Sequence, residues 1–336
     1  MNSGHLGVMS CRAAGRGAAG PGAAALLCGV FLIGCARAGD DPNGRLKPKG
    51  EPAAEAPLGR QIAWLGDLHQ PESVKYDSER DVFYISNMVG FGSDKDANGY
   101  IVEVSAGNLA NSRVLAENGR GGVVLDAPKG MAIHGDTLWV CDIDVMRAIN
   151  RKTGVALGTL DMRANGAVLL NDVAIGGDGA MYITDTGILM TPTGVIHKGG
   201  DRVFAVKDGI VSVLASGQML GRPNGITWDP EGNRLVVVSF DPFQSEMYSV
   251  APGGQRRRLA AGNGKFDGVE PVGRGRFMVA SWNDSSVRLI GNGANRRIAD
   301  NVMQPADIGF DTRRNRLAIP IGPLNQMQLW QLPRGM

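Results

Sequence analysis

Six residues stand at equivalent places in a repeated motif: Glu72, Lys129, Asn171, Asn224, Asp267 and Ala306. All but Ala306 have a polar or charged side chain that could do chemistry. Two carboxylates and two amides facing one cavity would form a set of oxygen donors, which hard divalent cations such as Ca²⁺ prefer. Burying these groups without a partner would be costly, so a bound ion would account for them. Asn and Asp also cap turns at strand starts, but four such residues at one repeat position favour a metal site.

The elements that must position these residues are short strands. The motif openings are Pro71-Glu72-Ser73, Pro128-Lys129-Gly130, Leu170-Asn171-Asp172, Pro223-Asn224-Gly225, Phe266-Asp267-Gly268 and Pro305-Ala306-Asp307. Each is followed, after a turn rich in Gly, Asp and Asn, by a second apolar strand such as VFYIS or TLWVC. Successive openings lie 39 to 57 residues apart, close to the spacing of four-stranded propeller blades. The sequence therefore predicts an all-β fold, a six-bladed β-propeller over residues 60–336, whose first strands line a central channel.

The ends of the repeat array indicate how the ring closes. Residues 61–65 (QIAWL) form a lone strand before the first opening, and the last unit ends at MQLWQL after only three strands. We expect the N-terminal strand to complete the sixth blade, which would leave no exposed sheet edge. A seven-bladed ring would need a further opening, and the sequence has none.

The N-terminal segment has the features of an export signal. Residues 1–39 carry no acidic side chain, and Arg12 and Arg16 precede an apolar run at 23–33 that is too short to span a bilayer. The run ends at Leu32-Ile33-Gly34-Cys35, which resembles a bacterial lipobox. We expect residues 1–34 to be a lipoprotein signal peptide, Cys35 to be lipidated, and residues 35–59 to form a flexible Pro-rich tether. An ordinary secretory signal, cut near residues 36–39, is the alternative.

Net charge and cysteine content restrict which partners and which disulfides the sequence allows. The chain has 35 Lys and Arg against 33 Asp and Glu, and without Arg12 and Arg16 the balance is neutral. Nucleic acid is therefore not an expected partner. Cys141 would be the sole thiol left in the mature chain, which excludes an intramolecular disulfide. We expect an extracytoplasmic monomer, on the periplasmic side or the cell surface, that touches membrane only through its lipid.

Four motifs resemble a known family. They are PESVKYD, LLNDVAIGGDGAMYITDT, RPNGITWDPEGNRL and FDGVEPVGRGRFMVASW. Through these motifs, nearly all of residues 60–332 resemble the senescence marker protein/gluconolactonase (luciferin-regenerating-enzyme-like) family. The resemblance to the paraoxonases is more distant. The resemblance implies a six-bladed calcium-dependent hydrolase. It also implies that Glu72, Asn171, Asn224 and Asp267 hold the ion, and that Asp267 is the base that activates water.

Two positions depart from the family pattern. Leu169 stands where the sugar lactonases carry Arg, which argues against a sugar-acid lactone as substrate. Lys129 stands where the paraoxonases have His, which argues against a histidine proton relay. Lys129 would either stabilise a developing oxyanion or balance the two carboxylates, and the sequence leaves both roles open.

A further motif matches the first half of a calcium loop. Asp94, Asp96 and Asn98 have the required spacing, but Ser105 stands where the loop needs Glu. We interpret this segment as a turn, with a second surface ion as the alternative.

The sequence as a whole favours an enzyme, a hydrolase of lactones or related esters that uses Ca²⁺ or another divalent cation such as Zn²⁺, Mn²⁺ or Mg²⁺. The alternative is a non-catalytic propeller with a structural central ion that binds a ligand or protein.

Overall fold

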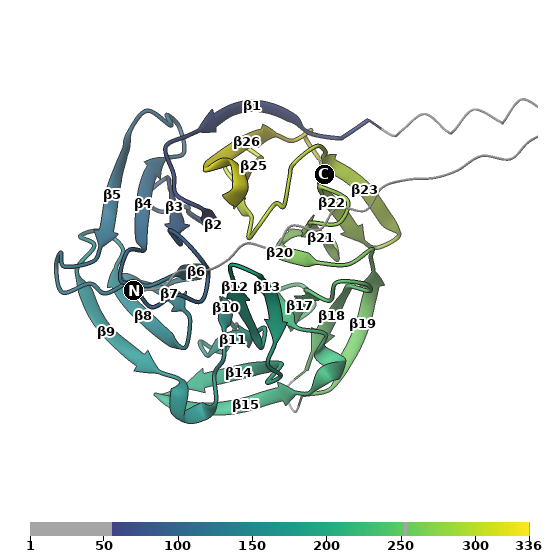
Figure 1. Cartoon of the computed structure of the whole chain (residues 1–336). Coiled ribbons are helices and arrows are strands. Elements are labelled where there is room, and N and C mark those ends of the chain that lie inside the picture. Colours follow the sequence, from purple (N-terminus) through teal and green to yellow (C-terminus); the bar gives the residue numbers. More distant parts are fainter. Residues whose placement is uncertain (1–55, 252–253, 336) are drawn as a thin grey trace, which may run out of the picture. The chain divides into compact units, whose positions relative to one another are not determined.

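The computed structural model describes residues 56–251 and 254–335, and these form an all-β ring of blades (Figure 1). The predicted lipidation site Cys35, the signal segment 1–34 and most of the tether lie outside the described residues. None of the helices in the described part is long and apolar enough to cross a membrane.

Six sheets of four antiparallel strands make up the ring, and the prediction of a six-bladed propeller is confirmed. Blade 1 consists of β2 (Pro71–Asp77), β3 (Val82–Asn87), β4 (Tyr100–Ser105) and β5 (Ser112–Glu117). Blade 2 consists of β6 (Pro128–His134), β7 (Thr137–Asp142), β8 (Val145–Asn150) and β9 (Ala156–Asp161). Blade 3 consists of β10 (Leu170–Ile175), β11 (Met181–Asp185), β14 (Arg202–Lys207) and β15 (Ile210–Ser216).

The second half of the ring repeats this order. Blade 4 consists of β16 (Pro223–Asp229), β17 (Arg234–Ser239), β18 (Glu246–Val250) and β19 (Arg256–Ala261). Blade 5 consists of β20 (Phe266–Gly273), β21 (Arg276–Ser281), β22 (Ser286–Gly291) and β23 (Ala294–Ala299). Blade 6 consists of β24 (Gly309–Asp311), β25 (Arg316–Ile321), β26 (Gln326–Gln331) and β1 (Arg60–Leu65). Three short 3₁₀ turns complete the fold: η1 (Arg163–Asn165), η2 (Gln218–Leu220) and η3 (Gly322–Leu324).

Blade 6 joins the two ends of the described chain. β1 pairs antiparallel with β26, in a register that places Arg60 opposite Gln331 and Leu65 opposite Met327. The outermost strand of this blade therefore comes from the start of the propeller, while its three inner strands come from the end.

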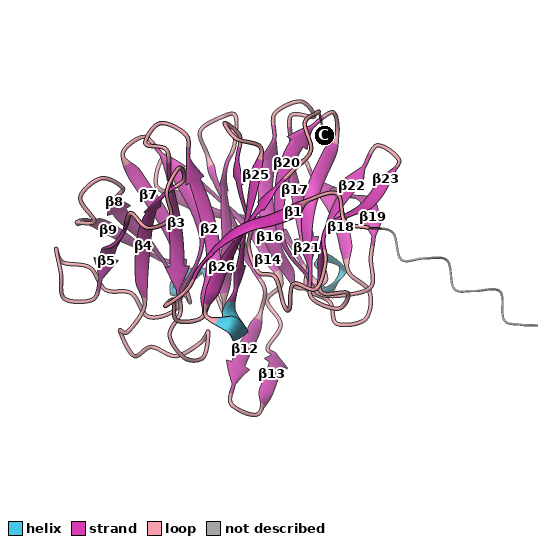
Figure 2. Cartoon of the chain, turned by 90° about the horizontal axis from the view of Figure 1, so that it is seen from above, coloured by secondary structure: helices cyan, strands magenta, loops and turns pink. Residues whose placement is uncertain are grey.

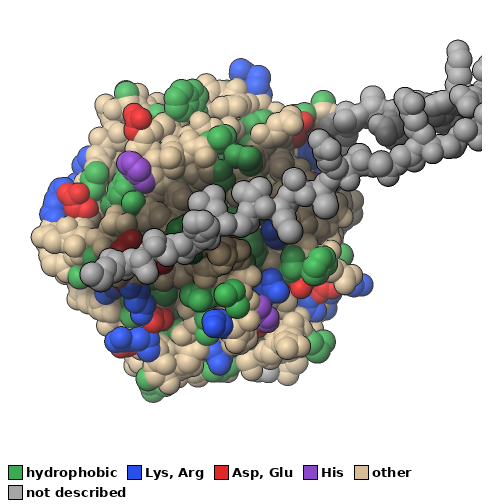
Figure 3. Space-filling model, in the orientation of Figure 1, with side chains coloured by type: hydrophobic (Ala, Val, Ile, Leu, Met, Phe, Trp, Pro, Cys, Tyr) green, Lys and Arg blue, Asp and Glu red, His purple; other side chains and the backbone are tan. Residues whose placement is uncertain are grey.

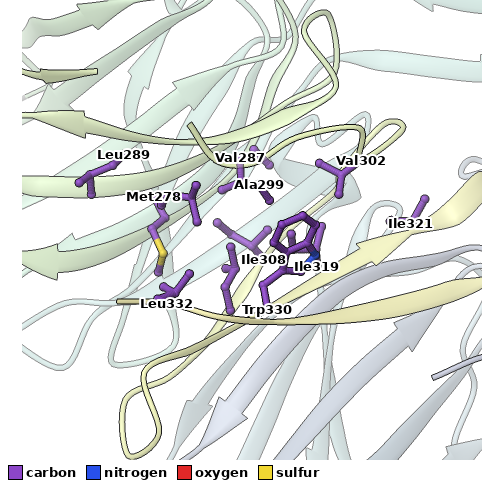
Figure 4. Packing of buried hydrophobic residues seen from close by; sticks show 13 residues of the cluster. Met278, Val287, Leu289, Ala299, Val302, Ile308, Ile319, Ile321, Trp330 and Leu332 are labelled. Atoms are coloured by element: carbon purple, nitrogen blue, oxygen red, sulfur yellow. The ribbon is translucent and has the colours of Figure 1, made fainter. Parts of the chain in front are cut away.

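The apolar core is distributed between the blades rather than gathered at one centre. Figure 4 shows the cluster where blades 5 and 6 meet, in which Met278, Ile308, Ile319 and Trp330 pack together. Alternate residues of each strand face one neighbouring blade or the other, which is why the strands read as nearly continuous apolar runs.

Small residues let the innermost strands approach one another around the channel. The residues that follow the six motif positions are Ser73, Gly130, Asp172, Gly225, Gly268 and Asp307. A Cβ on Gly130 would lie 2.3 Å from Oδ1 of Asp172, and one on Gly268 would lie 2.6 Å from the Cα of Asp307. Each of these two Asp residues therefore needs a neighbour with little or no side chain.

The two longest repeats carry insertions on the same face of the ring. In blade 1 the insertion is the loop 88–99 between β3 and β4, and in blade 3 it is the hairpin of β12 (Ile188–Thr191) and β13 (Gly194–His197). Figure 2 shows this hairpin projecting from one face of the ring. The backbone N–H of Met190 donates to Oγ of Ser93 at 2.9 Å, so the two insertions touch.

Candidate metal and active site

The six motif positions come together in one cavity, as the sequence predicts for a propeller. Each lies just before or at the beginning of an innermost strand, and each is buried. They line a cavity of about 340 Å³ that opens on the face carrying the two insertions. The residues concerned are Glu72, Lys129, Asn171, Asn224, Asp267 and Ala306.

Four of these side chains each carry a buried oxygen without a hydrogen-bond partner among the described residues. The atoms are Oε2 of Glu72, Oδ1 of Asn171, Oδ1 of Asn224 and Oδ1 of Asp267. Leaving a buried polar atom unpaired costs about 1–3 kcal/mol, and more for a charged group. Four such acceptors on one cavity, two carboxylate and two amide, match the donor set of a hard divalent cation. The residues present therefore fit a metal ion.

The two carboxylates of this set are held in an environment that disfavours their charge. Burial raises the pKa of Glu72 well above its usual value, the nearby charge of Asp267 raises it further, and Lys129 opposes the shift. Burial also raises the pKa of Asp267, with Asp307 and Asp172 adding to the effect. A cation between Glu72 and Asp267 would favour their ionised forms.

Lys129 is fully buried, and its ammonium group is directed to backbone oxygens. It donates to the carbonyl oxygen of Gly92 at 2.6 Å and to that of Ala127 at 2.9 Å. Burial lowers the pKa of this group, while Glu72 and Asp142 oppose the shift. Two of the three ammonium protons thus hold loops in place, and one remains for another acceptor.

A second layer of charges lies along the channel, further from the cavity mouth. Asp172 accepts a 2.7 Å hydrogen bond from the backbone N–H of Ile226 in blade 4, and Asp307 accepts one of 2.5 Å from Oγ of Ser73 in blade 1. These contacts join neighbouring blades. Further along, Lys75 pairs with Glu270 at 3.0 Å across the channel.

The cavity wall above the ring is mainly apolar. Met88 and Phe91 come from the loop 88–99, and Ile188, Met190 and Val195 come from the hairpin. Opposite them lie Phe240 and Trp282, whose rings meet edge to face with centroids 4.9 Å apart. Figure 3 views this face and shows hydrophobic side chains around its hollowed centre. Leu169 is buried beside Ile188 in an apolar cluster under the hairpin.

The half calcium loop lies apart from this cavity. Oδ2 of Asp96 accepts a 2.7 Å hydrogen bond from the side-chain amide of Asn98, and the N–H of Ala97 donates to Asp126 at 3.0 Å. Asp94 lies in the same segment between β3 and β4 but is not part of the cavity wall. No group of three or more His, Cys, Asp or Glu side chains within 56–251 and 254–335 is arranged to hold a metal ion by itself.

Several cavity residues were not predicted from the sequence. Lys265, Phe240 and Trp282 form one wall, and the hairpin forms another. The hairpin left one signal, because the opening at Leu170 and the next at Pro223 lie 53 residues apart. The longest interval, 57 residues from Pro71 to Pro128, contains the other insertion.

Comparison with known proteins supports the fold. No protein-family model and no curated protein matches the sequence. Among solved structures, a gluconolactonase from Xanthomonas campestris superposes with a TM-score of 0.61 at 20% identity, covering 82% of this chain and 90% of that chain. A luciferin-regenerating enzyme gives a TM-score of 0.60 at 13% identity, over 83% of this chain and 96% of that chain. A chain of a nidogen/laminin complex gives 0.53 at 14% identity, over 72% and 92%.

These likenesses place the chain in a structural class. It has the propeller fold of the gluconolactonase and luciferin-regenerating enzyme structures, as its motifs predict. Identities of 20% and below establish this shared fold, and function has to be argued from the site itself.

Proposed function

We propose that this protein is a metal-dependent hydrolase of lactones or related esters. The observation that carries the proposal is the set of four unpartnered oxygens, on Glu72, Asn171, Asn224 and Asp267, at the base of a largely apolar cavity. A structural ion alone would not need an open cavity above it. A reacting ester would need both a cation and room for its organic part.

The four oxygens would hold Ca²⁺ or another divalent cation, which supplies Lewis acidity toward a carbonyl group when bound. Asp267 would accept the proton of the attacking water as general base, because it is a buried carboxylate in the cavity floor. Lys129 would donate its remaining proton to the developing negative charge on the substrate oxygen, while Gly92 and Ala127 hold the ammonium group in place.

The cavity wall bears on the substrate class. A sugar-acid lactone carries several hydroxyl groups that would need polar partners, whereas this wall is mainly apolar, with Met88, Phe91, Ile188 and Met190, and has few polar side chains, such as Gln70, Lys265 and Gln304. Leu169, which stands where the sugar lactonases carry Arg, is buried in the neighbouring apolar cluster. We therefore expect lactones or esters with an apolar body.

We further propose that the protein is an extracytoplasmic lipoprotein. The support is the sequence match at residues 32–35, which would leave the propeller tethered to a membrane through lipid on Cys35. A monomer remains our expectation for the mature chain.

A hydrolysis assay tests the enzymatic proposal. A panel of γ- and δ-lactones and aryl esters should be turned over in the presence of Ca²⁺, Mn²⁺, Zn²⁺ or Mg²⁺ and not after chelation. The control variant is Glu72→Gln, which removes the charge of one of the four residues proposed to hold the ion. No turnover of any substrate with any ion, in protein that melts cooperatively, would favour the non-catalytic alternative. In that alternative the ion rigidifies the ring and the outer loops bind a partner.

A further inference from the structure

We propose, on the basis of the hydrolase function above, that Lys265 binds a carboxylate carried by the substrate. The substrate would then be a lactone or ester with an apolar body and a negatively charged substituent. Lys265 is half-buried and lines the cavity two residues before Asp267, immediately before β20.

The backbone fixes Lys265 in a conformation that side chains rarely adopt. Its φ is 53°, in the left-handed region. Its N–H donates to the carbonyl oxygen of Asp241 at 2.7 Å, and its own carbonyl oxygen accepts from the N–H of Trp282 at 3.0 Å. The equivalent residues of three other blades, Gln70, Arg222 and Gln304, share this left-handed conformation, so the repeat itself imposes it.

The ammonium group of Lys265 rests against two aromatic rings. Its Nζ lies 5.7 Å from the ring centroid of Trp282 and 6.0 Å from that of Phe240. No ion pair joins Lys265 to a carboxylate within the described part of the chain. Cation–π contact orients an ammonium group without cancelling its charge, so Lys265 is held at the cavity wall with its charge available.

The same repeat position is also polar in the next two blades around the ring. Gln304 in blade 6 and Gln70 in blade 1 also line the cavity, with φ values of 47° and 51°. At the motif position of blade 6 stands Ala306, whose small side chain leaves room in the cavity for a ligand. Lys265, Gln304 and Gln70 thus add polar groups to the wall on the side of blades 5, 6 and 1, whereas the hairpin of blade 3 contributes only apolar side chains.

The charges of the lining agree with an anionic substrate. Its carboxylates are Glu72 and Asp267, and its ammonium groups are Lys129 and Lys265. A divalent cation held by the first two would offset their charges, which leaves both lysines in excess. The anionic end would lie toward Lys265, and the apolar body toward the hairpin.

A binding experiment tests this assignment without requiring turnover. Titration calorimetry compares 4-phenylbutanoate with 4-phenylbutanamide, which share an apolar body and differ in charge, on the Ca²⁺-loaded wild type, Lys265→Met and Lys207→Met. Lys207 is the control because its ammonium group pairs with Asp178 at 3.3 Å, away from the cavity. We expect the wild type and Lys207→Met to prefer the carboxylate about tenfold, which corresponds to about 1.4 kcal/mol. Lys265→Met should lose this preference and keep its amide affinity.

Three outcomes would overturn the assignment: equal affinities in the wild type, a preference that survives in Lys265→Met, or a preference that disappears only on chelation. The last would assign the carboxylate to the ion. Melting curves check folding, and Lys265→Gln, which keeps a polar side chain, serves if Lys265→Met does not fold. If the preference is found while no ester is hydrolysed, the proposed function fails and the carboxylate site stands. If esters are hydrolysed and Lys265→Met leaves the preference unchanged, only the inference on Lys265 fails.

Discussion

The ammonium group of Lys129 donates a 2.6 Å hydrogen bond to the carbonyl oxygen of Gly92, which precedes it by 37 residues. This contact ties the innermost strand of blade 2 to the insertion of blade 1. Gly92 in turn packs so closely on the hairpin that a Cβ there would lie 2.7 Å from Sδ of Met190. Lys129 therefore links the base of the cavity to the loop 88–99 and the hairpin, which form its wall.

Replacing Lys129 should therefore make the loop 88–99 less firmly held, as well as alter catalysis. In Lys129→Met the carbonyl oxygens of Gly92 and Ala127 lose their donor, at a cost of roughly 1–3 kcal/mol for each buried group left unpaired. We expect the thermal midpoint to fall by several degrees and proteolysis within 88–99 to become faster. Lys207→Met is the matched control and should melt like the wild type. Unchanged stability would mean that water satisfies both carbonyls.

A buried ion pair on blades 1 and 2 should make stability depend on pH. Arg151 donates to Oδ2 of Asp77 at 2.7 Å, and both side chains are buried. Burial disfavours the Asp77 charge, but hydrogen bonds from the Arg80 backbone and from Arg151 outweigh it, and the pKa of Asp77 is lowered. A lowered pKa stabilises the fold above the unfolded-state pKa of about 3.9, and the contribution is lost as the pH falls through the folded-state pKa.

Asp77→Asn should accordingly melt several degrees below the wild type at pH 6, since it removes the one buried carboxylate paired with Arg151 and leaves only the exposed Glu79 and Asp136 as its charge partners. The gap should narrow as the pH falls from about 5 to below 3, because the wild type then loses the same charge. Melting curves across this range check the expectation. A gap of constant size would assign the loss to packing rather than to charge.

The repeat pattern predicted both the blades and the ring residues because a propeller places equivalent positions at one centre. Glu72, Asn171, Asn224 and Asp267 could be found in this way. Lys265 and Trp282 could not, because their role depends on how a left-handed residue and an aromatic pair meet across loops. The direction of the Lys129 ammonium group could likewise not be predicted from the sequence, because a loop from another blade sets it.

Removal of divalent ions should lower the thermal midpoint. An ion bound only by the native state stabilises it by about 2.7 kcal/mol at a concentration of 100 times its Kd. For a propeller of this size, at about 2.1 cal/mol/K of unfolding entropy per residue, that corresponds to a shift of roughly 4–5 °C. Calorimetric scans with chelator and with millimolar Ca²⁺ measure the difference, and Asn224→Ala should reduce it. Identical midpoints under both conditions would contradict a central ion.

The proposed lipid anchor can be tested independently of the site. Cys35→Ala should release the protein into the soluble fraction of cells, with the melting transition of the propeller unchanged, because the tether precedes the first strand. Fractionation followed by immunoblotting measures this, with Cys141→Ala as the control. Equal membrane retention of Cys35→Ala and the wild type would favour an ordinary secretory signal or another attachment.

If Asp267 is the general base, its replacement by Asn should cause a large loss of activity. Asp267→Asn keeps an oxygen of nearly the same shape and position but cannot accept a proton from water. We expect kcat to fall on the order of 10²-fold or more. Because the substitution also removes a ligand charge, the loss has to be measured at an ion concentration that restores the thermal midpoint. Glu72→Gln is the matched control, since it removes the same charge from the ring without touching the base, and at saturating ion it should regain most of its turnover. If Asp267→Asn regains turnover equally well, Asp267 is a ligand only, and Lys129 in its neutral form becomes the candidate base.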